Sequence, residues 1–430
     1  MTLNDIPAIN LQHPATREQW KRCREEGLPY PLMTLKGRKI VLGVTGGIAA
    51  YKAAELVREL IKAGAEVHVV MTRNAQAFIT PLTFQALSGN PVTTELFNLI
   101  AESEIGHIAL ADRADLLAIA PATANIIGKI AAGITDDMLT TIVMATQAPV
   151  LLAPAMNVHM WENEICQGNI QKLRSQGYHF IDPDAGELAC GYEGKGRLAE
   201  IPAIVEEIRT LLSPKDFSGE KVLVTAGPTE EPIDPVRFLS NRSSGKMGFA
   251  LARAARRRGA EVTLISGPTA LAVPPQTRHI AVRSASQMRE AVMNHFENAS
   301  ILIMAAAVSD YRPKQKAAEK IKKTKPETIV ELELNPDILA EAGKIKQSRI
   351  LVGFAAETEN LLPSSREKLE RKNLDLIVAN DVTLPGAGFE VDTNIVKMID
   401  RDGKVEELPL MTKEDLADRI LDRIALLKKS

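Results

Sequence analysis

The chain has 430 residues, of which 45% are hydrophobic and 25% are charged, and its formal net charge is -2. This composition is that of a globular protein, and the length exceeds what one core usually supports, so we expect two or three domains. A charge so close to neutral argues against nucleic acid or an anionic membrane as a bulk partner. Three cysteines form no disulfide framework and no apolar run reaches transmembrane length, so we expect a cytoplasmic protein.

The first domain opens with a buried-strand pattern over residues 39–45, which stops at Gly46-Gly47. A helix pattern over residues 48–63 and a second strand pattern over residues 66–71 follow, which together make a βαβ unit. Because parallel strands need a right-handed crossover, Gly46-Gly47 is expected at the carboxyl edge of the sheet, where open α/β folds bind ligands. Further strands are expected at residues 115–120, 150–153 and 178–181. The pattern predicts a doubly wound domain.

The same order of strand, loop and helix begins again after a short polar segment. We therefore predict an α/β protein with two doubly wound, Rossmann-like domains. The predicted divisions are an N-terminal extension at residues 1–37, a first domain at 38–212, a linker at 213–219 and a second domain at 220–430.

A long polar loop dominates the second domain. It follows the strand pattern of residues 221–226, and helix periodicity resumes only after Gly248. A long surface connection without a role is one reading. A ligand site is the other, because backbone amides at the start of a helix bind phosphate. The polar side chains that would surround such a ligand are Arg237, Asn241, Arg242, Ser243, Ser244 and Lys246.

Two residues in the first domain could carry chemistry. His107 lies in an apolar segment, so a core histidine and a catalytic base are both open readings. Cys190 is flanked by Gly191, Gly194 and Gly196, a setting that suits a thiol acting on a bound ligand. The chain lacks the Cys-x-x-Cys and His-x-x-x-His spacings of metal sites.

In the second domain, residues 304–310 form a strand pattern that ends in the carboxylate of Asp310. The lysine run that contains Lys320 is either a solvated face or a flap over a polyphosphate. Lys368 and Lys372 are four residues apart on a predicted helix and so lie on one face of it. Phe354 is a candidate for base stacking or for the core.

Taken together, the motifs resemble the bifunctional phosphopantothenoylcysteine decarboxylase/phosphopantothenate–cysteine ligase family of coenzyme A synthesis, over about residues 38–425. The motifs that carry the resemblance are Thr45–Lys52, Gly106–Ile108, Ala120–Asn125, Pro154–Trp161, Ala189–Gly191, Ser240–Gly248, Ala306–Arg312 and Glu319–Lys323. Several are weak singly, but their order on one chain is specific.

The resemblance implies a flavodoxin-like flavoprotein domain that binds FMN, with candidate contacts Thr45, Gly46, Gly47, Thr72, Thr123 and Asn125. Its substrate is a cysteine amide that loses CO₂, and oxidation of the thiol supplies the electron sink that decarboxylation needs. By the same resemblance His107 is the base, Asn157 holds the substrate carboxylate and Cys190 donates a proton.

The second domain, by resemblance, joins 4′-phosphopantothenate to cysteine with CTP through an acyl-cytidylate, with Mg²⁺ on the phosphates through ligands that the sequence does not assign. Asn241 is implied at the acyl-cytidylate and Lys320 on the triphosphate. The residues implied around CTP are Met304, Ala305, Ala306, Asp310, Lys320, Asn335, Pro336, Asp337, Ile338, Phe354, Lys368 and Lys372. The family forms homo-oligomers, with ligase dimers and decarboxylase trimers.

Two features depart from the family pattern, namely the extension at residues 1–37 and Leu198 where the pattern has methionine.

Two alternative functions stay open at this point. One is an enzyme with a single activity, in which the other domain serves assembly. The other is a non-catalytic regulator that binds flavin or nucleotide.

Overall fold

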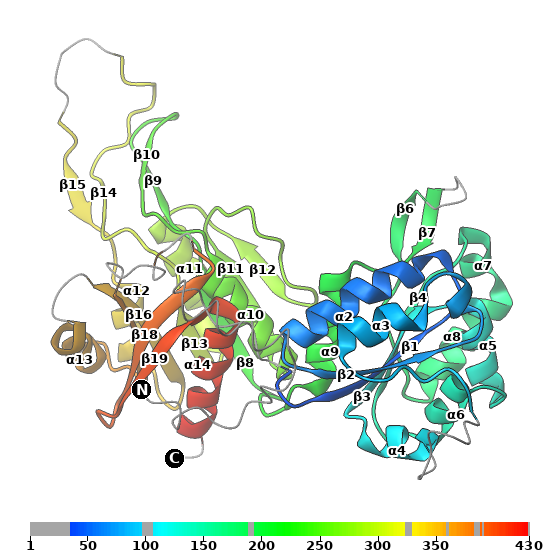
Figure 1. Cartoon of the computed structure of the whole chain (residues 1–430). Helices are drawn as coiled ribbons and strands as arrows, with labels where there is room; N and C mark the ends of the chain where they lie inside the picture. Colours follow the sequence, from blue (N-terminus) through cyan, green and yellow to red (C-terminus); the bar gives the residue numbers. More distant parts are fainter. Residues whose placement is uncertain are drawn as a thin grey trace. The chain divides into compact units, whose positions relative to one another are not determined.

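The computed structural model describes residues 35–96, 106–187, 193–322, 329–357, 361–381, 388 and 391–428. Its described residues divide into two compact units, the first ending at Ser213 and the second beginning at Pro214. Each unit has its own sheet and its own buried core (Figure 1). The described residues include no helix that is both long enough and apolar enough to cross a membrane.

The first unit is built on a five-stranded sheet in which all neighbouring strands are parallel. Its strands are β1 (Lys39–Val44), β2 (Glu66–Met71), β3 (Leu116–Ala122), β4 (Val150–Pro154) and β5 (His179–Phe180). The spatial order is β2-β1-β3-β4-β5, which is the flavodoxin-like form of the doubly wound fold. The strand order reverses between β1 and β3, so a ligand site is expected beyond their carboxyl ends.

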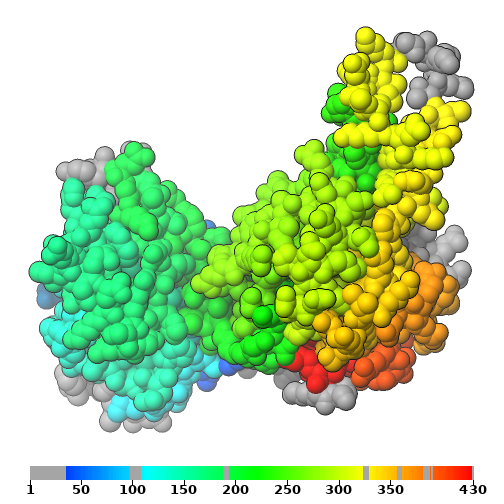
Figure 2. Space-filling model, turned by 180° about the vertical axis from the view of Figure 1, so that it is seen from behind, coloured from blue at the N-terminus to red at the C-terminus, as the bar shows by residue number. Residues whose placement is uncertain are grey.

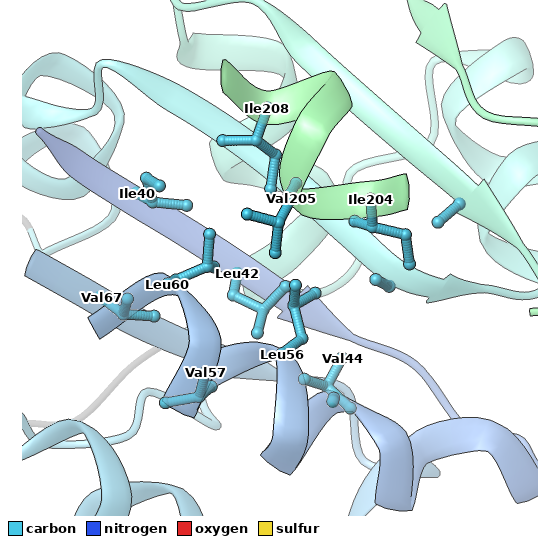
Figure 3. Close-up of a cluster of buried hydrophobic side chains, with 14 of the residues drawn as sticks. Ile40, Leu42, Val44, Leu56, Val57, Leu60, Val67, Ile204, Val205 and Ile208 are labelled. Carbon is cyan, nitrogen blue, oxygen red and sulfur yellow. The ribbon is translucent and has the colours of Figure 1, made fainter. Parts of the chain in front are cut away.

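Helices cover both faces of this sheet. They are α2 (Lys52–Lys62), α3 (Pro81–Ser88), α4 (Gly106–Arg113), α5 (Ala124–Ala132), α6 (Met138–Ala145), α7 (Val158–Glu162), α8 (Glu164–Ser175) and α9 (Ile201–Leu212), with the 3₁₀ turns η2 (Ile48–Tyr51) and η3 (Ala75–Ala77). Because side chains alternate along a strand, Ile40, Leu42 and Val44 pack against α2 and α9 (Figure 3), whereas Val41 packs in the core on the opposite face. A hairpin of β6 (Asp184–Glu187) and β7 (Glu193–Arg197) lies outside the main sheet.

The second unit has an eight-stranded sheet in the order β12-β11-β8-β13-β16-β17-β18-β19. Its strands are β8 (Lys221–Ala226), β11 (Glu261–Ser266), β12 (Arg278–Ala281), β13 (Ile301–Met304), β16 (Ile350–Glu357), β17 (Leu376–Asp381), β18 (Thr393–Asp400) and β19 (Val405–Thr412). The six strands from β12 to β17 are parallel and follow the Rossmann order, in which the switch point lies between β8 and β13. Strand β18 pairs antiparallel with both of its neighbours, β17 and β19. This topology confirms the predicted fold class.

The helices of the second unit are α10 (Lys246–Arg257), α11 (Ala285–Phe296), α12 (Ile338–Lys344), α13 (Leu361–Arg371) and α14 (Lys413–Leu427). Helices α10 and α14 cover one face of the sheet, and α11, α12 and α13 contribute to the core on the other. Two nearly buried arginines at the end of α10 are paired with α14: Arg257, the last residue of the helix, lies 3.0 Å from Asp418, and Arg258, which follows it, lies 2.7 Å from Asp422. Buried arginines need such partners, and these pairs join the two helices.

Two antiparallel pairs extend from the second unit at the carboxyl end of its parallel strands (Figures 1 and 2). One is formed by β9 (Glu230–Pro232) and β10 (Phe238–Ser240), and the other by β14 (Tyr311–Pro313) and β15 (Leu332–Leu334). The first pair lies inside the segment that the sequence analysis treats as a polar loop. Propensity does not reveal it because each of its strands has only three residues.

The start of α10 differs from the prediction. The helix begins at Lys246, and Gly248 lies inside it. A Cβ on Gly248 would come within 2.4 Å of the Cβ of Ala226, so this glycine allows α10 to approach β8 closely. Sequence periodicity missed the first turn because its face toward the sheet is made of glycine rather than a large apolar residue.

Residues near the predicted domain divisions are packed. Leu35, from the end of the predicted extension, is 1% exposed in the first core. Phe217, from the predicted linker, is fully buried in the second core, where Arg258 lies over its ring. Residues 1–34 lie outside the described residues.

Candidate functional site

The first unit contains a cavity of about 1020 Å³ at the carboxyl ends of β1 and β3. This volume is at the upper end of ligand pockets. The residues predicted to contact FMN all line it, as does Asn157. They are Thr45, Gly46, Gly47, Thr72, Thr123 and Asn125. The structure therefore brings these residues together around one hollow, and their contacts with flavin stay a prediction.

A buried hydroxyl joins the two strands that form this cavity. Thr45, which is 2% exposed, lies just after β1 and donates its hydroxyl to the carbonyl of Pro121 at 2.7 Å. Its oxygen also accepts the backbone N–H of Thr123 at 3.1 Å. Thr123 in turn caps α5, because its hydroxyl accepts the N–H of Ile126 at 3.5 Å. The start of α5 thus lies at the cavity, and a helix N-terminus is a place where backbone amides can bind an anion.

Glycines let the backbone come close together at the floor and wall of the cavity. A Cβ on Gly46 would lie 2.4 Å from the Cβ of Asn74, and one on Gly196 would lie 2.3 Å from the carbonyl oxygen of Met156. A Cβ on Gly47 would meet only a methyl group of Thr123, at 3.5 Å. Gly46 and Gly196 are therefore required by packing, whereas Gly47 leaves room over the strand end. Neither Asn74 nor Gly196 was singled out as a cofactor contact from the sequence.

Asn157 lies at the start of α7, where its side-chain oxygen accepts the N–H of His159 at 2.9 Å. This cap fixes the orientation of the amide at the cavity wall. Across the cavity, Lys129 forms a pair with Asp136 at 2.7 Å. Their hydrogen bond raises the pKa of Lys129 and lowers that of Asp136, so both groups stay charged at neutral pH. No sequence motif indicated this pair.

Two predicted catalytic residues cannot be placed in the cavity. The backbone of His107 lies in α4, but its side chain is outside the described residues. Cys190 also lies outside them, in the segment between β6 and β7. Their roles stay predictions.

The predicted ligase site lies at the switch point of the second unit. The isolated bridge between Pro228 and Ala307 joins the segments that follow β8 and β13. Asn241 donates its side-chain N–H to the carbonyl of Ala307 at 3.2 Å, and Asn335 donates to that of Ser309 at 2.9 Å. The Oδ1 atom of Asn335 is buried and makes no hydrogen bond. Asn241, the segment after β13 and the segment before α12 thus lie close together, and their roles in ligation stay predictions.

One of the two lysines predicted to bind CTP, Lys372, follows the end of α13 at Arg371 and is already paired. Lys372 lies 2.9 Å from Asp337, which also caps α12 by accepting the N–H of Ala340 at 3.0 Å. Burial raises the pKa of Asp337, but the hydrogen bonds from Lys372 and Ala340 outweigh it and leave the pKa lowered. Phe354 is half-buried and packs against the core, which fits the reading of a core residue while leaving part of its ring accessible.

Other residues predicted around CTP come from several elements of the second unit. Met304 ends β13, Asp310 is exposed before β14, Lys368 is half-buried on α13, and Lys320 is exposed in the segment between β14 and β15. A separate cavity of about 670 Å³ lies beyond β11 and β12 and includes none of the predicted residues. Within the described part of the chain, no three acidic, histidine or cysteine side chains are grouped so as to hold a metal ion.

Comparison with known proteins divides the chain into two parts that correspond to the two units of the structure. Residues 31–213 match the family described as Flavoprotein, and residues 217–427 match the DNA/pantothenate metabolism flavoprotein C-terminal domain. A protein of Bacillus subtilis (strain 168), "Coenzyme A biosynthesis bifunctional protein CoaBC", is 51% identical over 404 residues, which cover 92% of this chain and 98% of that protein. The chain belongs to the CoaBC family. The CoaBC protein of Escherichia coli (strain K12) is 48% identical over 397 residues, covering 91% and 98%.

Two solved structures are each similar to part of this chain. The crystal structure of the C-terminal domain of a CoaBC protein is 45% identical, covers 50% of this chain and 98% of that chain, and has a TM-score of 0.44. A mutant PPC decarboxylase complexed with pantothenoylaminoethenethiol is 33% identical, covers 40% and 96%, and has a TM-score of 0.36. CoaBC membership confirms the predicted family and makes the chain a bifunctional enzyme of coenzyme A biosynthesis with a flavoprotein domain.

Proposed function

We propose that this chain converts 4′-phosphopantothenate into 4′-phosphopantetheine in two reactions, one in each unit. The second unit would join the acid to cysteine with CTP, and the first would decarboxylate the product with FMN. The main support is that the alignment with CoaBC relatives spans both units, and that the residues proposed to contact FMN line one cavity of the first unit. Two sites on one chain fit consecutive reactions.

The ligation needs the carboxylate of phosphopantothenate to be activated. Oxide is too poor a leaving group, so transfer of CMP forms an acyl-cytidylate, pyrophosphate leaves, and the cysteine amine attacks the acyl carbon. We assign Asn241 to the acyl-cytidylate and Lys320 to the triphosphate, where a fixed positive charge stabilises the charge that develops on the phosphates. Mg²⁺ would bind the phosphates themselves, which is its usual place in nucleotide sites. Asp310, Lys368 and Lys372 would complete the nucleotide site.

The decarboxylation is assigned to the cavity of the first unit. The fit to FMN rests on the hydroxyls of Thr45 and Thr123, the amides at the start of α5, and the close backbone approach at Gly46. When bound, FMN supplies the oxidising power that turns the substrate thiol into an electron sink. Asn157, held by its cap on α7, would bind the substrate carboxylate before it leaves.

The remaining steps concern protons. His107 would take the proton released on oxidation of the substrate, and the thiol of Cys190 would return one when the product is reduced. An ordinary thiol has a pKa of about 8.5 and is mostly protonated at neutral pH, which suits a proton donor.

Assembly into homo-oligomers, with decarboxylase trimers and ligase dimers, is part of the proposal. Large apolar side chains at the rim of the first cavity are exposed, namely Ile48, Tyr51 and Met160 at 62%, 61% and 48%. In the second unit Phe238, Tyr311 and Leu334 on the projecting strands are 50%, 51% and 69% exposed. Such clusters favour contact with another copy of the chain.

A cytoplasmic location of the protein stays a prediction from the sequence.

One experiment tests both reactions. The purified full chain is incubated with 4′-phosphopantothenate, cysteine, CTP and Mg²⁺, and the products are identified by mass spectrometry. We expect pyrophosphate, CMP and 4′-phosphopantetheine. A parallel incubation with ATP in place of CTP tests the nucleotide assignment. Accumulation of 4′-phosphopantothenoylcysteine alone would remove the decarboxylase half of the proposal, and the absence of pyrophosphate would remove the ligase half.

A further inference from the structure

A buried carboxylate organises the turn between β9 and β10. The Asp234 side chain has no exposed surface, and its Oδ1 accepts the backbone N–H groups of Val236 and Arg237, both at 2.8 Å. Its Oδ2 accepts Nε and Nη2 of Arg237 at 3.0 and 2.5 Å. The hydrogen bond from Arg237 lowers the pKa of Asp234 well below its usual range despite the opposing effect of burial. The carboxylate is therefore ionised at physiological pH.

The same pair reaches a distant segment of the chain. Oδ2 of Asp234 accepts the N–H of Ile321 at 3.1 Å, and Nη2 of Arg237 donates to the carbonyl of Ile321 at 2.9 Å. Four residues earlier in that segment, the N–H of Ala317 donates to the carbonyl of Ile233 at 3.0 Å. The backbone is thus held on both sides of Lys320. The charge of Asp234 is matched by Arg237, so the ammonium of Lys320 is left for another partner.

These contacts matter because the segment around Lys320 has no regular secondary structure. An exposed lysine on such a segment samples many positions, and ordering it when a ligand binds has an entropic cost. Catalysis by a positive charge depends on that charge being in place before the reaction, and misplacement by about 1 Å can reduce a rate on the order of 100-fold. The hairpin that carries Asp234 follows directly from the carboxyl end of β8, at the switch point.

We propose that Asp234 is a positioning residue for the ligase reaction, which holds Lys320 at the nucleotide through its hydrogen bond to Ile321. The inference rests on the proposed function, in which Lys320 binds the triphosphate. Asp234 itself touches neither substrate nor nucleotide. It acts on the backbone beside the lysine, and Arg237 completes the attachment.

Asp234→Asn is a sharp test of this role. The amide oxygen can still accept the N–H groups of Val236 and Arg237, so the turn is kept. The amide nitrogen, however, places a donor against the donors of Ile321 and Arg237. We expect pyrophosphate release with CTP to fall about 10- to 100-fold, mainly in kcat. Glu331→Gln is the matched control, because Glu331 is an exposed carboxylate on the same projecting segment, 3.6 Å from Lys314, and we expect it to keep the wild-type rate.

A double mutant separates positioning from general damage. Lys320→Gln alone should lower pyrophosphate release on the order of 100-fold. If Asp234 acts through Lys320, adding Asp234→Asn to Lys320→Gln should change the rate by less than about 3-fold, because residues in one pathway are not additive. If the rate losses of the two single variants multiply in the double variant, the proposal is refuted. Thermal unfolding shows whether Asp234→Asn damages the second unit. If it does, Ile321→Pro serves as the second variant, because it removes the same N–H donor and should reproduce the loss of pyrophosphate release.

Limited trypsin digestion gives a readout that does not depend on activity. Without nucleotide, cleavage after Lys320 and Lys322 should be faster in Asp234→Asn than in the wild type and in Glu331→Gln. Unchanged cleavage would overturn the proposal even if the rate falls. A wild-type protein that releases no pyrophosphate would contradict the proposed function instead, and digestion would still decide whether Asp234 holds the segment.

Discussion

Thr45 and Thr123 are joined across the switch point of the first unit, with their hydroxyl oxygens 3.2 Å apart and the N–H of Thr123 donating to Thr45 at 3.1 Å. The contact connects residues that are 78 positions apart in sequence. It sets the distance between the end of β1 and the start of α5, and so the shape of the cavity floor.

Thr45→Val removes this contact while keeping the side-chain volume. We expect the free energy of unfolding of the first unit to fall by about 1–3 kcal/mol, because buried hydrogen-bonding groups of Pro121 and Thr123 lose their partner. We also expect the purified protein to hold less flavin. Chemical denaturation and the flavin-to-protein absorbance ratio measure the two effects. Thr80→Val, at an exposed position before α3, is the control, and equal flavin content in both variants would contradict the assignment.

Neighbouring glycines provide a second test. Gly46→Ala must displace Asn74, because the new Cβ would lie 2.4 Å from the Cβ of that residue, whereas the new Cβ of Gly47→Ala would lie 3.5 Å from a methyl group of Thr123. We expect Gly46→Ala to lower the melting temperature of the first unit and Gly47→Ala to leave it near that of the wild type. Differential scanning calorimetry compares the pair. Equal melting temperatures would show that the loop of Asn74 adapts to the extra atom.

Cys190→Ser tests the proton donor of the decarboxylation. A serine hydroxyl is a far weaker acid than a thiol, so we expect CO₂ release to continue while the oxidised enethiol product accumulates in place of the reduced product. Mass spectrometry separates the two by their difference of two hydrogens. A wild-type yield of the reduced product would assign proton donation to another group. Cys166→Ser is the control, because Cys166 lies in α8 with its side chain buried in the core, and the change should leave the product unchanged.

The acid stability of the second unit depends on Asp216. This carboxylate accepts Nε and Nη2 of Arg258 at 2.9 and 2.5 Å, and the hydrogen bond lowers its pKa despite partial burial. A pKa that is lower in the folded state stabilises the unit above about pH 4, and this contribution is lost as the pH falls through the folded-state pKa. We therefore expect Asp216→Asn to be less stable at pH 7 and to lose less stability on acidification.

Urea unfolding at a series of pH values measures this effect. Asp402→Asn, which replaces an exposed carboxylate at the β18–β19 turn, should keep the wild-type slope of stability against pH. If Asp216→Asn shows the wild-type slope as well, the pair with Arg258 contributes nothing to folding.

Much of the fold could be predicted because periodicity and strand ends are local signals. The apolar runs at β1, β8 and β13 end at the carboxyl edges of their sheets, and parallel pairing alone brings those edges together. For that reason Gly46-Gly47 could be placed at the carboxyl edge of its sheet before any coordinates, whereas the grouping of Gly46 with Thr123, and of Asn241 with the residues around CTP, came from the family resemblance.

The features that the sequence analysis missed depend on contacts between distant residues. The amino-acid order by itself determined which segments become strands and helices, and it carried the motifs of the family. Only the tertiary structure decided that Asp234 holds Ile321, that Phe217 belongs to a core, and that Lys129 lies beside Asp136 at the cavity. Each of these relationships depends on which groups folding brings within hydrogen-bonding or van der Waals distance, and short-range propensity carries no record of that.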